Sequence, residues 1–290
     1  MSTDYKPDEN TYVIDSESAA EMARLLHQDR LLTEHLKGLS LEYTDPSNLK
    51  EILDIACGPG GWVLDMARAY PNIQMTGIEI SKQMTQYARA QASAQGLDNA
   101  SFRTMDALKP LDFPDNSFDF INARLLFGFM PTKAWPPLLQ ECKRILRTGG
   151  VIRLTEGEIG ISNGPVVEQL GGMFIRALQV AGLSFSPDGR HVGITPLLGR
   201  FLQDAGFQNI QKTAYALDYS AGTDLHLPFV QDMLAGAKLA HPFLIKMGVT
   251  TQEEIDRLYE QSKQEMYSEN FCGVWFYLSV WGEKPTSASK

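Results

Sequence analysis

The feature that most constrains the fold is a glycine-rich segment at residues 52–62, with the sequence Ile-Leu-Asp-Ile-Ala-Cys-Gly-Pro-Gly-Gly-Trp. Its apolar beginning is typical of a short buried strand, and Gly-Pro-Gly-Gly at residues 58–61 ends that strand abruptly. A helical pattern follows directly. Glycines at such a turn permit positive φ angles and let a ligand approach the backbone. The segment therefore predicts a strand, a tight turn and a helix that bind a ligand.

The spacing of the glycines distinguishes between two kinds of nucleotide ligand. A dinucleotide fingerprint G-x-G-x-x-G that began at Gly58 would need glycine at position 63, where the chain has Val63. Asp54 lies inside the strand, where its carboxylate would repel a pyrophosphate but could pair with an amino group. An NAD-dependent oxidoreductase is therefore the more distant alternative.

Several motifs in order resemble the class I S-adenosylmethionine-dependent methyltransferases, in their ubiquinone-biosynthesis-like branch (methyltransferase domain 11/25 type). The first family motif, D/E-x-G-x-G-x-G, is matched by Asp54, Ala56, Gly58 and Gly60, with alanine in place of the first glycine. The stretch F-P-D-N-S-F-D at residues 113–119 and L-R-T-G-G at residues 146–150 also resemble motifs of that branch. The resemblance covers residues 50–156 and implies S-adenosyl-L-methionine as the cofactor.

The resemblance also assigns contacts to the ends of the following strands. An acid that ends the second strand, expected at residues 73–80, binds both ribose hydroxyls, and an Asp after the third strand holds the adenine amino group. Arg124, after the fourth strand, would bind the cofactor carboxylate or an anionic substrate. The implied cofactor-binding residues are Asp54, Ala56, Gly58, Gly60, Glu79, Ile80, Asp106, Ala107, Asn122 and Arg124.

Alternating strand and helix patterns over residues 51–156 predict a parallel sheet with right-handed crossovers. We expect an α/β fold, a doubly wound, seven-stranded, mostly parallel Rossmann-like sheet with helical lid insertions. Its methyltransferase core spans 49–222 and 271–284, and it includes a lid helix within about 159–193. Residues 1–48 form an N-terminal arm and cap helix. The segment 223–270 is too long for a hairpin loop, so we expect a helical lid, with a homodimer contact as the alternative.

The cap helix is predicted from a capping box, Ser18-Ala-Ala-Glu21, in which hydroxyl and carboxylate cap each other's backbone N–H groups. Apolar residues follow it at helical spacing as far as Leu39. N-terminal segments in the resembled family cover the cofactor, so Tyr12 and Gln28 are expected to touch the methionine end of the cofactor or the substrate.

The acceptor is expected to be a small organic molecule, with oxygen the favoured atom and carbon or nitrogen the alternatives. A hydroxyl acceptor would use a base, and His191, in a loop after the predicted pocket helix, is one candidate. Glu156 is the other, and Glu158 and Phe127 are candidate substrate contacts. A cofactor-bound enzyme that does not methylate, and a non-enzymatic binding module, remain open.

The charge and composition of the chain limit which classes of partner it is expected to bind. The formal net charge of -9 and the lack of a dense Lys/Arg run disfavour nucleic acid. No apolar run has the length of a membrane span, and the N-terminus lacks a signal-peptide layout, so a cytoplasmic location is expected. The three cysteines are too far apart for a C-x-x-C site, and no metal is expected.

Overall fold

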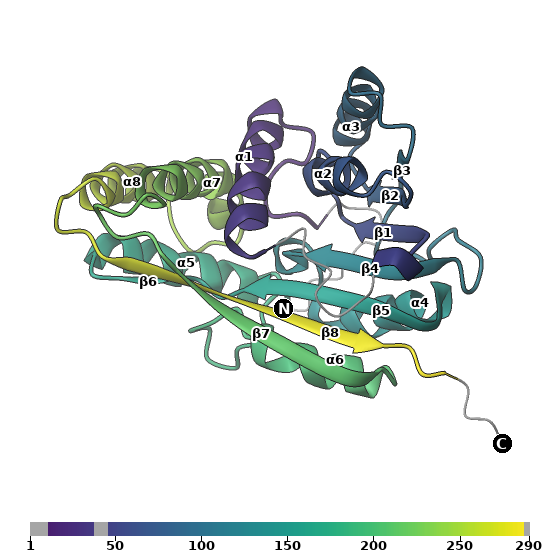
Figure 1. Cartoon of the computed structure of the whole chain (residues 1–290). Coiled ribbons are helices and arrows are strands. Elements are labelled where there is room, and N and C mark those ends of the chain that lie inside the picture. The colour runs from purple at the N-terminus through teal and green to yellow at the C-terminus, as the bar shows by residue number, and fades with distance from the viewer. Residues whose placement is uncertain (1–10, 38–45, 287–290) are drawn as a thin grey trace.

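The computed structural model describes residues 11–37 and 46–286, in which one sheet of eight strands is covered on both faces by helices (Figure 1). The strands are β1 (Glu51–Ile55), β2 (Gln74–Glu79), β3 (Ala100–Thr104), β4 (Phe118–Arg124), β5 (Leu146–Gly157), β6 (Ile161–Ser162), β7 (Gln208–Asp218) and β8 (Gly273–Glu283). The helices are α1 (Ala19–His35), α2 (Gly61–Ala69), α3 (Lys82–Ala94), α4 (Trp135–Ile145), α5 (Pro165–Val180), α6 (Leu198–Asp204), α7 (His226–Lys246) and α8 (Gln252–Met266).

The strand order in the sheet is β3-β2-β1-β4-β5-β8-β6, and β7 pairs with β8. Strands β1 to β5 run parallel, whereas β8 is antiparallel to β5, β6 and β7. The mostly parallel α/β sheet is therefore confirmed. The eighth strand is β6, whose two residues are too few to give a periodic pattern. The strand order reverses between β1 and β4, and ligands bind open α/β sheets at such a switch point.

Helices α2 and α3 lie on one side of the sheet and α4 and α6 on the other, whereas α5 packs against α7 and α8 (Figure 1). The central strands are buried on both faces, as parallel strands between two helix layers must be, and most of their side chains are apolar. Leu53 in β1 and Ile121 in β4 are completely buried. This rigid centre fixes where the carboxyl ends of the strands point.

The cap helix differs from its prediction at both ends. The Ser18 side chain accepts from the Glu21 N–H at 3.4 Å, as a helix cap should. The predicted hydrogen bond from the Ser18 N–H to the Glu21 carboxylate is wrong. The Ser18 N–H donates to the Asp15 carbonyl, and the fully buried Glu21 carboxylate accepts from Tyr12 and Arg24. The helix ends at His35. Residues 1–10 of the predicted arm, and Leu39, lie outside the described residues.

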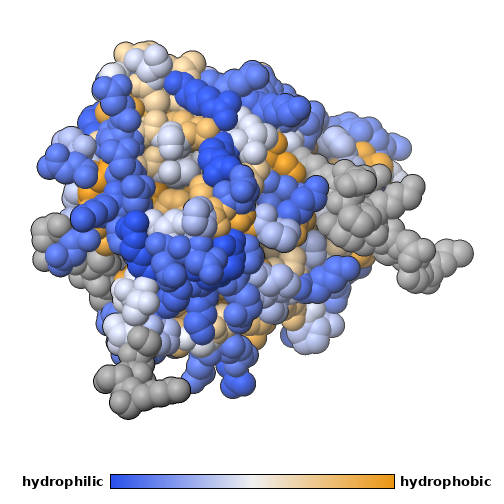
Figure 2. Space-filling model, turned by 90° about the vertical axis from the view of Figure 1, so that its right-hand side faces the viewer, coloured by the Kyte–Doolittle hydropathy of each residue, from blue (hydrophilic) through white to orange (hydrophobic). Residues whose placement is uncertain are grey.

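The predicted insertion at 223–270 consists of the two helices α7 and α8, and α7 packs against α1. Hydrophilic residues cover most of the side of the molecule where β3 and the C-terminal end lie, with hydrophobic residues in a strip between them (Figure 2). None of the helices in the described part of the chain is long and apolar enough to cross a membrane.

Candidate cofactor site

A cavity of about 400 Å³ lies at the carboxyl ends of the parallel strands. Its walls come from the glycine turn after β1, the ends of β2, β3 and β4, and the α1 face that covers them. Segments far apart in the sequence meet here because parallel strands direct their carboxyl ends to one edge of the sheet.

Most of the predicted cofactor residues line this cavity. They are Asp54, Ala56, Gly58, Glu79, Ile80, Asp106, Ala107 and Arg124. Gly60 and Asn122 are not in its wall but lie directly behind it. Asn122 is fully buried and holds Asp54, and Gly60 packs on the Phe102 ring.

The turn after β1 needs glycine at Gly60. Its φ of +84° lies in the left-handed region, and a Cβ there would come within 2.6 Å of the Phe102 ring and 2.8 Å of the Ala88 Cβ. Ala56, which replaces the first glycine of the motif, also has a positive φ of 55°. A left-handed conformation costs an L-residue about 1 to 2 kcal/mol, so this replacement is not conformationally neutral. Strain of this kind concentrates at functional sites.

Glu79, at the end of β2, is held by two backbone N–H groups. Gly58 donates to its Oε2 at 3.1 Å, and Ser81 donates to its Oε1 at 2.9 Å. Burial raises the pKa of this carboxyl, while the backbone donors act against that shift. Each carboxylate oxygen has a second lone pair, so Glu79 can also accept from two hydroxyl groups of a ligand.

Asp106 follows β3 and lines the cavity. Its Oδ1 accepts from the Leu108 N–H at 2.9 Å, and Lys109 Nζ lies 3.5 Å from its Oδ2. The side chain is partly exposed to the cavity. It can therefore accept a further hydrogen bond from an amino group.

Asp54 in β1 is fixed by a buried chain of hydrogen bonds across the sheet. Asn122 Nδ2 donates to Asp54 Oδ1 at 2.7 Å, and Arg153 Nε donates to Asn122 Oδ1 at 2.8 Å. Burial raises the pKa of Asp54 to about 7, against the lowering effects of Arg124 and Asn122, and the Asp29 carboxylate raises it further. A cation arriving in the cavity would favour the ionised form of Asp54.

Helix α1 closes the cavity through an ion pair. Arg124 Nη2 donates to Asp29 Oδ1, and Arg124 Nη1 donates to Thr33 Oγ1 at 3.3 Å. The Arg124 guanidinium also lies over the Trp62 ring, 5.9 Å from its centroid. Arg124 thus joins the end of β4 to the covering helix.

A second polar cluster joins the cavity wall to α7. Tyr12 Oη donates to Glu21 Oε1 at 2.6 Å, and Arg24 binds both Glu21 oxygens, at 2.7 and 2.8 Å. Arg24 Nη1 also donates to Asp232 Oδ1 at 3.2 Å, and Gln28 Nε2 donates to Asp232 Oδ2 at 3.2 Å. We call these five residues the α1–α7 network. Tyr12 and Gln28 both line the cavity, so the network extends from its wall.

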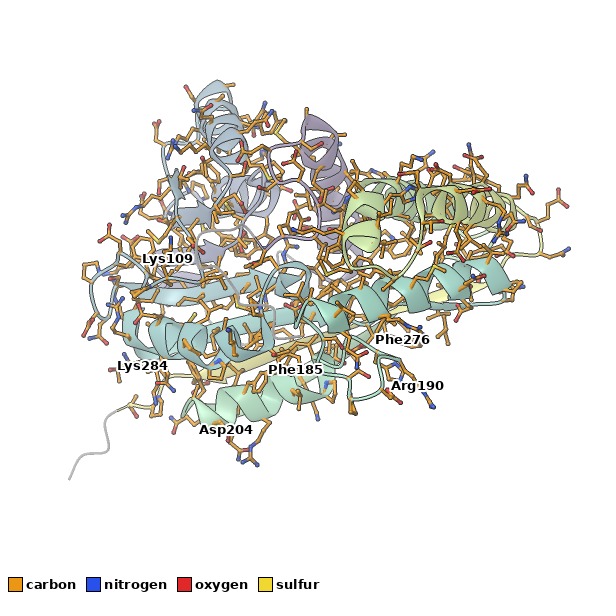
Figure 3. All side chains as sticks on the ribbon, turned by 180° about the vertical axis from the view of Figure 1, so that it is seen from behind. Lys109, Phe185, Arg190, Asp204, Phe276 and Lys284 are labelled. Carbon is orange, nitrogen blue, oxygen red and sulfur yellow. The ribbon has the colours of Figure 1, made fainter. Side chains whose placement is uncertain are left out.

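Neither predicted base lines the cavity. The Glu156 carboxylate accepts from the Leu126 and Phe127 N–H groups, at 2.7 and 3.3 Å, and burial raises its pKa to about 8. His191 is exposed in its loop. Its neighbour Arg190 lies at the far side of the molecule from Lys109, which lines the cavity (Figure 3). The Glu156 carboxylate therefore supports the loop after β4, and His191 lies outside the cavity wall.

Two predicted substrate contacts also lie outside the cavity wall. The Glu158 carboxylate accepts from the Val192 N–H at 2.8 Å, the Gly193 N–H at 3.1 Å and the Thr195 hydroxyl at 2.8 Å, so it anchors the 184–195 segment. Phe127 packs against the main hydrophobic core. The sequence placed these residues correctly near strand ends, but a strand pattern does not tell which groups their side chains meet.

Sequence reasoning missed Asp29, which lines the cavity together with Leu25 and Leu32 of the same helix. A signal was present, because the three residues are spaced by four and three positions and so share one helix face. A carboxylate inside such an apolar stripe is uncommon and indicates a specific partner. In the described part of the chain, no three His, Cys, Asp or Glu residues are grouped as a metal site would need.

Comparisons with known proteins agree with this geometry. Residues 52–150 match the family model of a methyltransferase domain. The demethylmenaquinone methyltransferase of Geobacillus stearothermophilus is 31% identical over 103 residues, which is 35% of this chain and 43% of that protein. The match thus spans less than half of that relative. Methyltransferase pytC of Aspergillus terreus is 26% identical over 259 residues, covering 85% of this chain and 75% of that protein.

Solved structures show the same fold. Phosphoethanolamine N-methyltransferase 2 of Haemonchus contortus, determined with S-adenosyl-L-methionine, has a TM-score of 0.52 and 17% identity, over 89% of this chain and 53% of that one. The YcgJ protein of Bacillus subtilis has a TM-score of 0.51 and 15% identity, over 82% and 93% of the two chains. Residues 52–150 of this chain are therefore a methyltransferase domain, and the chain has the fold of S-adenosylmethionine-dependent methyltransferases.

Proposed function

We propose that this chain methylates a small organic acceptor and that the acceptor atom is oxygen. The observation that carries the proposal is the cavity at the switch point, with Asp54, Glu79 and Asp106 at separate places in its wall. S-adenosylmethionine, when bound, supplies a methyl group activated by the sulfonium. Glu79 would accept from the ribose hydroxyls, and Asp106 from the adenine amino group.

The covering helix supports a small acceptor. Helix α1 lies over the cavity and is fixed to the sheet through Asp29 and Arg124 and to α7 through Arg24 and Asp232. An acceptor would occupy the part of the cavity between α1 and the end of β4, where Tyr12 and Gln28 line the wall with apolar side chains of α1 and of the segment after β4. Enclosure there would exclude water and align the acceptor atom for transfer. The insertion would then act as a lid through α1, without lining the cavity itself.

The Tyr12–Glu21 hydrogen bond supports oxygen as the acceptor atom. Methylation of a hydroxyl forms an O–CH₃ bond and releases the hydroxyl proton. Tyr12 Oη could accept that proton while passing its own along the 2.6 Å hydrogen bond to Glu21. Burial raises the pKa of the Tyr12 phenol, so this side chain stays protonated until it can pass its proton on. Arg24 would hold Glu21 in place during the transfer.

Product mass tests this function. The full chain would be incubated with S-adenosylmethionine carrying a trideuterated methyl group and with a panel of phenols, carboxylic acids and amines. A gain of one CD₃ group in place of hydrogen in a hydroxyl compound supports the proposal. Cofactor binding without any methyl gain across the panel would instead support an enzyme or binding module of this fold that does not methylate.

A quinone-type acceptor is the second candidate. It is favoured by the similarity to demethylmenaquinone methyltransferases, at 31% identity over 103 residues. Adding a quinol to the panel and locating the transferred methyl by carbon NMR would distinguish carbon from oxygen as the accepting atom. Methyl transfer to carbon with no O-methyl product would replace the leading proposal by this one.

A further inference from the structure

We propose that two copies of this chain pair through strand β7, antiparallel and in one register, so that two eight-stranded sheets become one continuous sheet across a two-fold axis. The surface is the outer edge of β7, together with the face that carries Phe276 of β8. It lies apart from the cofactor cavity, which no residue of β7 lines. The proposal therefore does not depend on the proposed function.

Strand β7 is a long and regular edge of the sheet. In the described part of the chain it pairs with β8 alone (Figure 1). Its irregular pairing is confined to the first positions, and from Gln211 to Asp218 the register with β8 is unbroken. Those positions contain neither proline nor glycine, whereas β3 at the other edge is only five residues long. Edge strands are usually kept short, bulged or blocked by proline, because a regular edge invites another strand.

The backbone of β7 presents hydrogen-bonding groups on its outer side. Just beyond the strand, the Tyr219 N–H donates to the Gly273 carbonyl at 2.9 Å, in the same register with β8. Successive N–H groups of a strand point to opposite edges, so those of Ala214 and Ala216 point away from β8. Both alanines are exposed, and their small side chains let another backbone approach. The outer edge is therefore suited to strand addition.

The charged residues of β7 select one register for self-pairing. Outward groups must meet outward groups, which restricts the choice to registers that differ by two residues. When the strands cross at Tyr215, Ala214 lies opposite Ala216 of the second copy. In that register Lys212 lies opposite Asp218, and the two-fold axis repeats the pair at the other end. A shift of two residues in either direction would place both charges opposite uncharged residues.

Both charged side chains are accessible to a second copy. Lys212 and Asp218 are exposed, and they lie on the same face of β7 because an even number of residues separates them. The Asp218 carboxylate accepts from the Ser220 N–H at 3.0 Å, and its remaining lone pairs can accept from a lysine as well. Opposite charges directly across an antiparallel pair stabilise it. The charge pattern of this edge is therefore complementary to itself.

An apolar row would cross the junction in the same register. Phe276 of β8 lies opposite Ala216 and is 42% exposed, and Leu278 lies opposite Ala214. Residues directly opposite each other share a face of the sheet. Phe276 and Ala216 of one copy would thus continue into Ala214 and Leu278 of the other. Because the alanines carry only methyl groups, the exposed Phe276 ring can pack across them.

Sedimentation velocity of the full chain, over a range of protein concentrations, tests the pairing. The wild-type chain should reach twice its own mass of 32.3 kDa. Lys212→Asp and Asp218→Lys should each raise the dimer dissociation constant by about 10- to 100-fold, because each places two pairs of like charge at the junction. Lys263→Asp, which changes an exposed lysine of α8, should leave it unchanged. A wild-type chain that stays monomeric at every concentration overturns the proposal.

A mixture of the two variants tests the register. In a mixed dimer the new aspartate of one variant lies opposite the new lysine of the other, while the unchanged Asp218 and Lys212 face each other. An equimolar mixture should therefore return to the dimer. The proposal is overturned if both variants remain dimeric on their own, or if their mixture stays monomeric although circular dichroism shows both to be folded.

Disulfide cross-linking gives a second readout of the register. Tyr215 is the position that meets itself, as a non-hydrogen-bonded pair with Cα atoms about 4.5 Å apart, which is within the range for a disulfide. Cys272 is exposed, so the background is Cys272→Ser. On oxidation, Tyr215→Cys should give a covalent dimer, and Ala214→Cys, which faces Ala216, should give much less. Cross-linking through position 214 that equals or exceeds that through 215 would contradict the register.

Discussion

Gly58 and Glu79 are joined across two parallel strands, because the Gly58 N–H donates to Glu79 Oε2 at 3.1 Å. The same carboxylate accepts from the Ser81 N–H at the start of α3. Glu79 therefore fixes the glycine turn after β1 and the entry to α3 at once. The Glu79 side chain both positions the turn and lines the cavity, so its removal should disturb the turn and weaken ligand binding.

Replacing Glu79 is the first test of the cofactor site. Glu79→Gln should reduce affinity for S-adenosylhomocysteine by about 10- to 100-fold, because one charged acceptor is lost. Glu79→Ala should weaken binding further, since both backbone donors lose their partner. Equilibrium titration measures both effects. An exposed acid of α8, Glu253, offers the control Glu253→Gln, and unchanged affinity in Glu79→Ala would contradict the assignment.

Two glycines with positive φ separate crowding from backbone strain. Gly60→Ala would place a Cβ 2.6 Å from the Phe102 ring, and it should lower the unfolding free energy by more than the cost of a left-handed conformation alone. Gly96→Ala has the same kind of φ, but nothing lies within 4 Å of the added Cβ. It should cost only about 1 to 2 kcal/mol. Urea denaturation measures the unfolding free energy of both variants. An equal loss of unfolding free energy in Gly60→Ala and Gly96→Ala would contradict the packing of the turn on β3.

The pKa of Asp54 predicts a pH dependence of stability. Burial raises it from 3.8 to about 7, so the folded chain binds this proton more tightly than the unfolded chain does. The contribution of Asp54 to the unfolding free energy is then fully present below pH 3.8 and is lost as pH rises through about 7. Asp54→Asn should remove that slope between pH 3.8 and about 7. The difference between the denaturation midpoints of the two proteins across this range measures the effect, and a constant difference would contradict it.

Protonation of Asp54 should also weaken the binding of a cationic ligand. S-adenosylmethionine affinity in the wild-type chain should rise as pH increases toward 7 and beyond, because the ionised carboxylate attracts the cation. Asp54→Asn should bind more weakly and with little pH dependence. Titrations at three pH values are sufficient, and a pH dependence that persists in the variant would assign the titration to another group.

Tyr12 and His191 make opposite predictions for catalysis. Tyr12→Phe should lower kcat for a hydroxyl acceptor by about 10²- to 10⁴-fold, the usual contribution of a general base, with little change in cofactor affinity. His191→Ala should leave kcat unchanged, because the side chain is exposed outside the cavity. Steady-state rates, measured with the acceptor that product mass identifies, distinguish the two roles. Loss of activity in His191→Ala with full activity in Tyr12→Phe would reverse the two roles.

The cofactor half of the fold could be predicted from the sequence because its signals are local. The glycine turn ends a buried strand within a few residues, and a candidate acid stands at or just after the end of each of the next two strands, Glu79 in β2 and Asp106 after β3. In a parallel sheet, strand ends must meet at one edge, so position along the chain becomes position in space. Eight of the ten predicted cofactor residues therefore line the cavity.

The acceptor half could not be predicted in the same way, because its contacts join distant segments. Glu21 was expected to cap its own helix, but the carboxylate instead binds Tyr12 and Arg24, and Arg24 reaches Asp232, 208 positions away. Glu156 had the residue type and strand end of a base, yet its carboxylate binds backbone N–H groups. Periodicity gives the face of an element, whereas the partner of a polar side chain depends on tertiary packing.

The central claim is that this cavity binds S-adenosylmethionine, and calorimetric titration of the purified full chain tests it most directly. We predict one site per chain for S-adenosylmethionine and for S-adenosylhomocysteine, with NAD giving no heat of binding. Glu79→Ala should lose most of the affinity while remaining folded. Binding of NAD with no response to either S-adenosyl compound would contradict the claim.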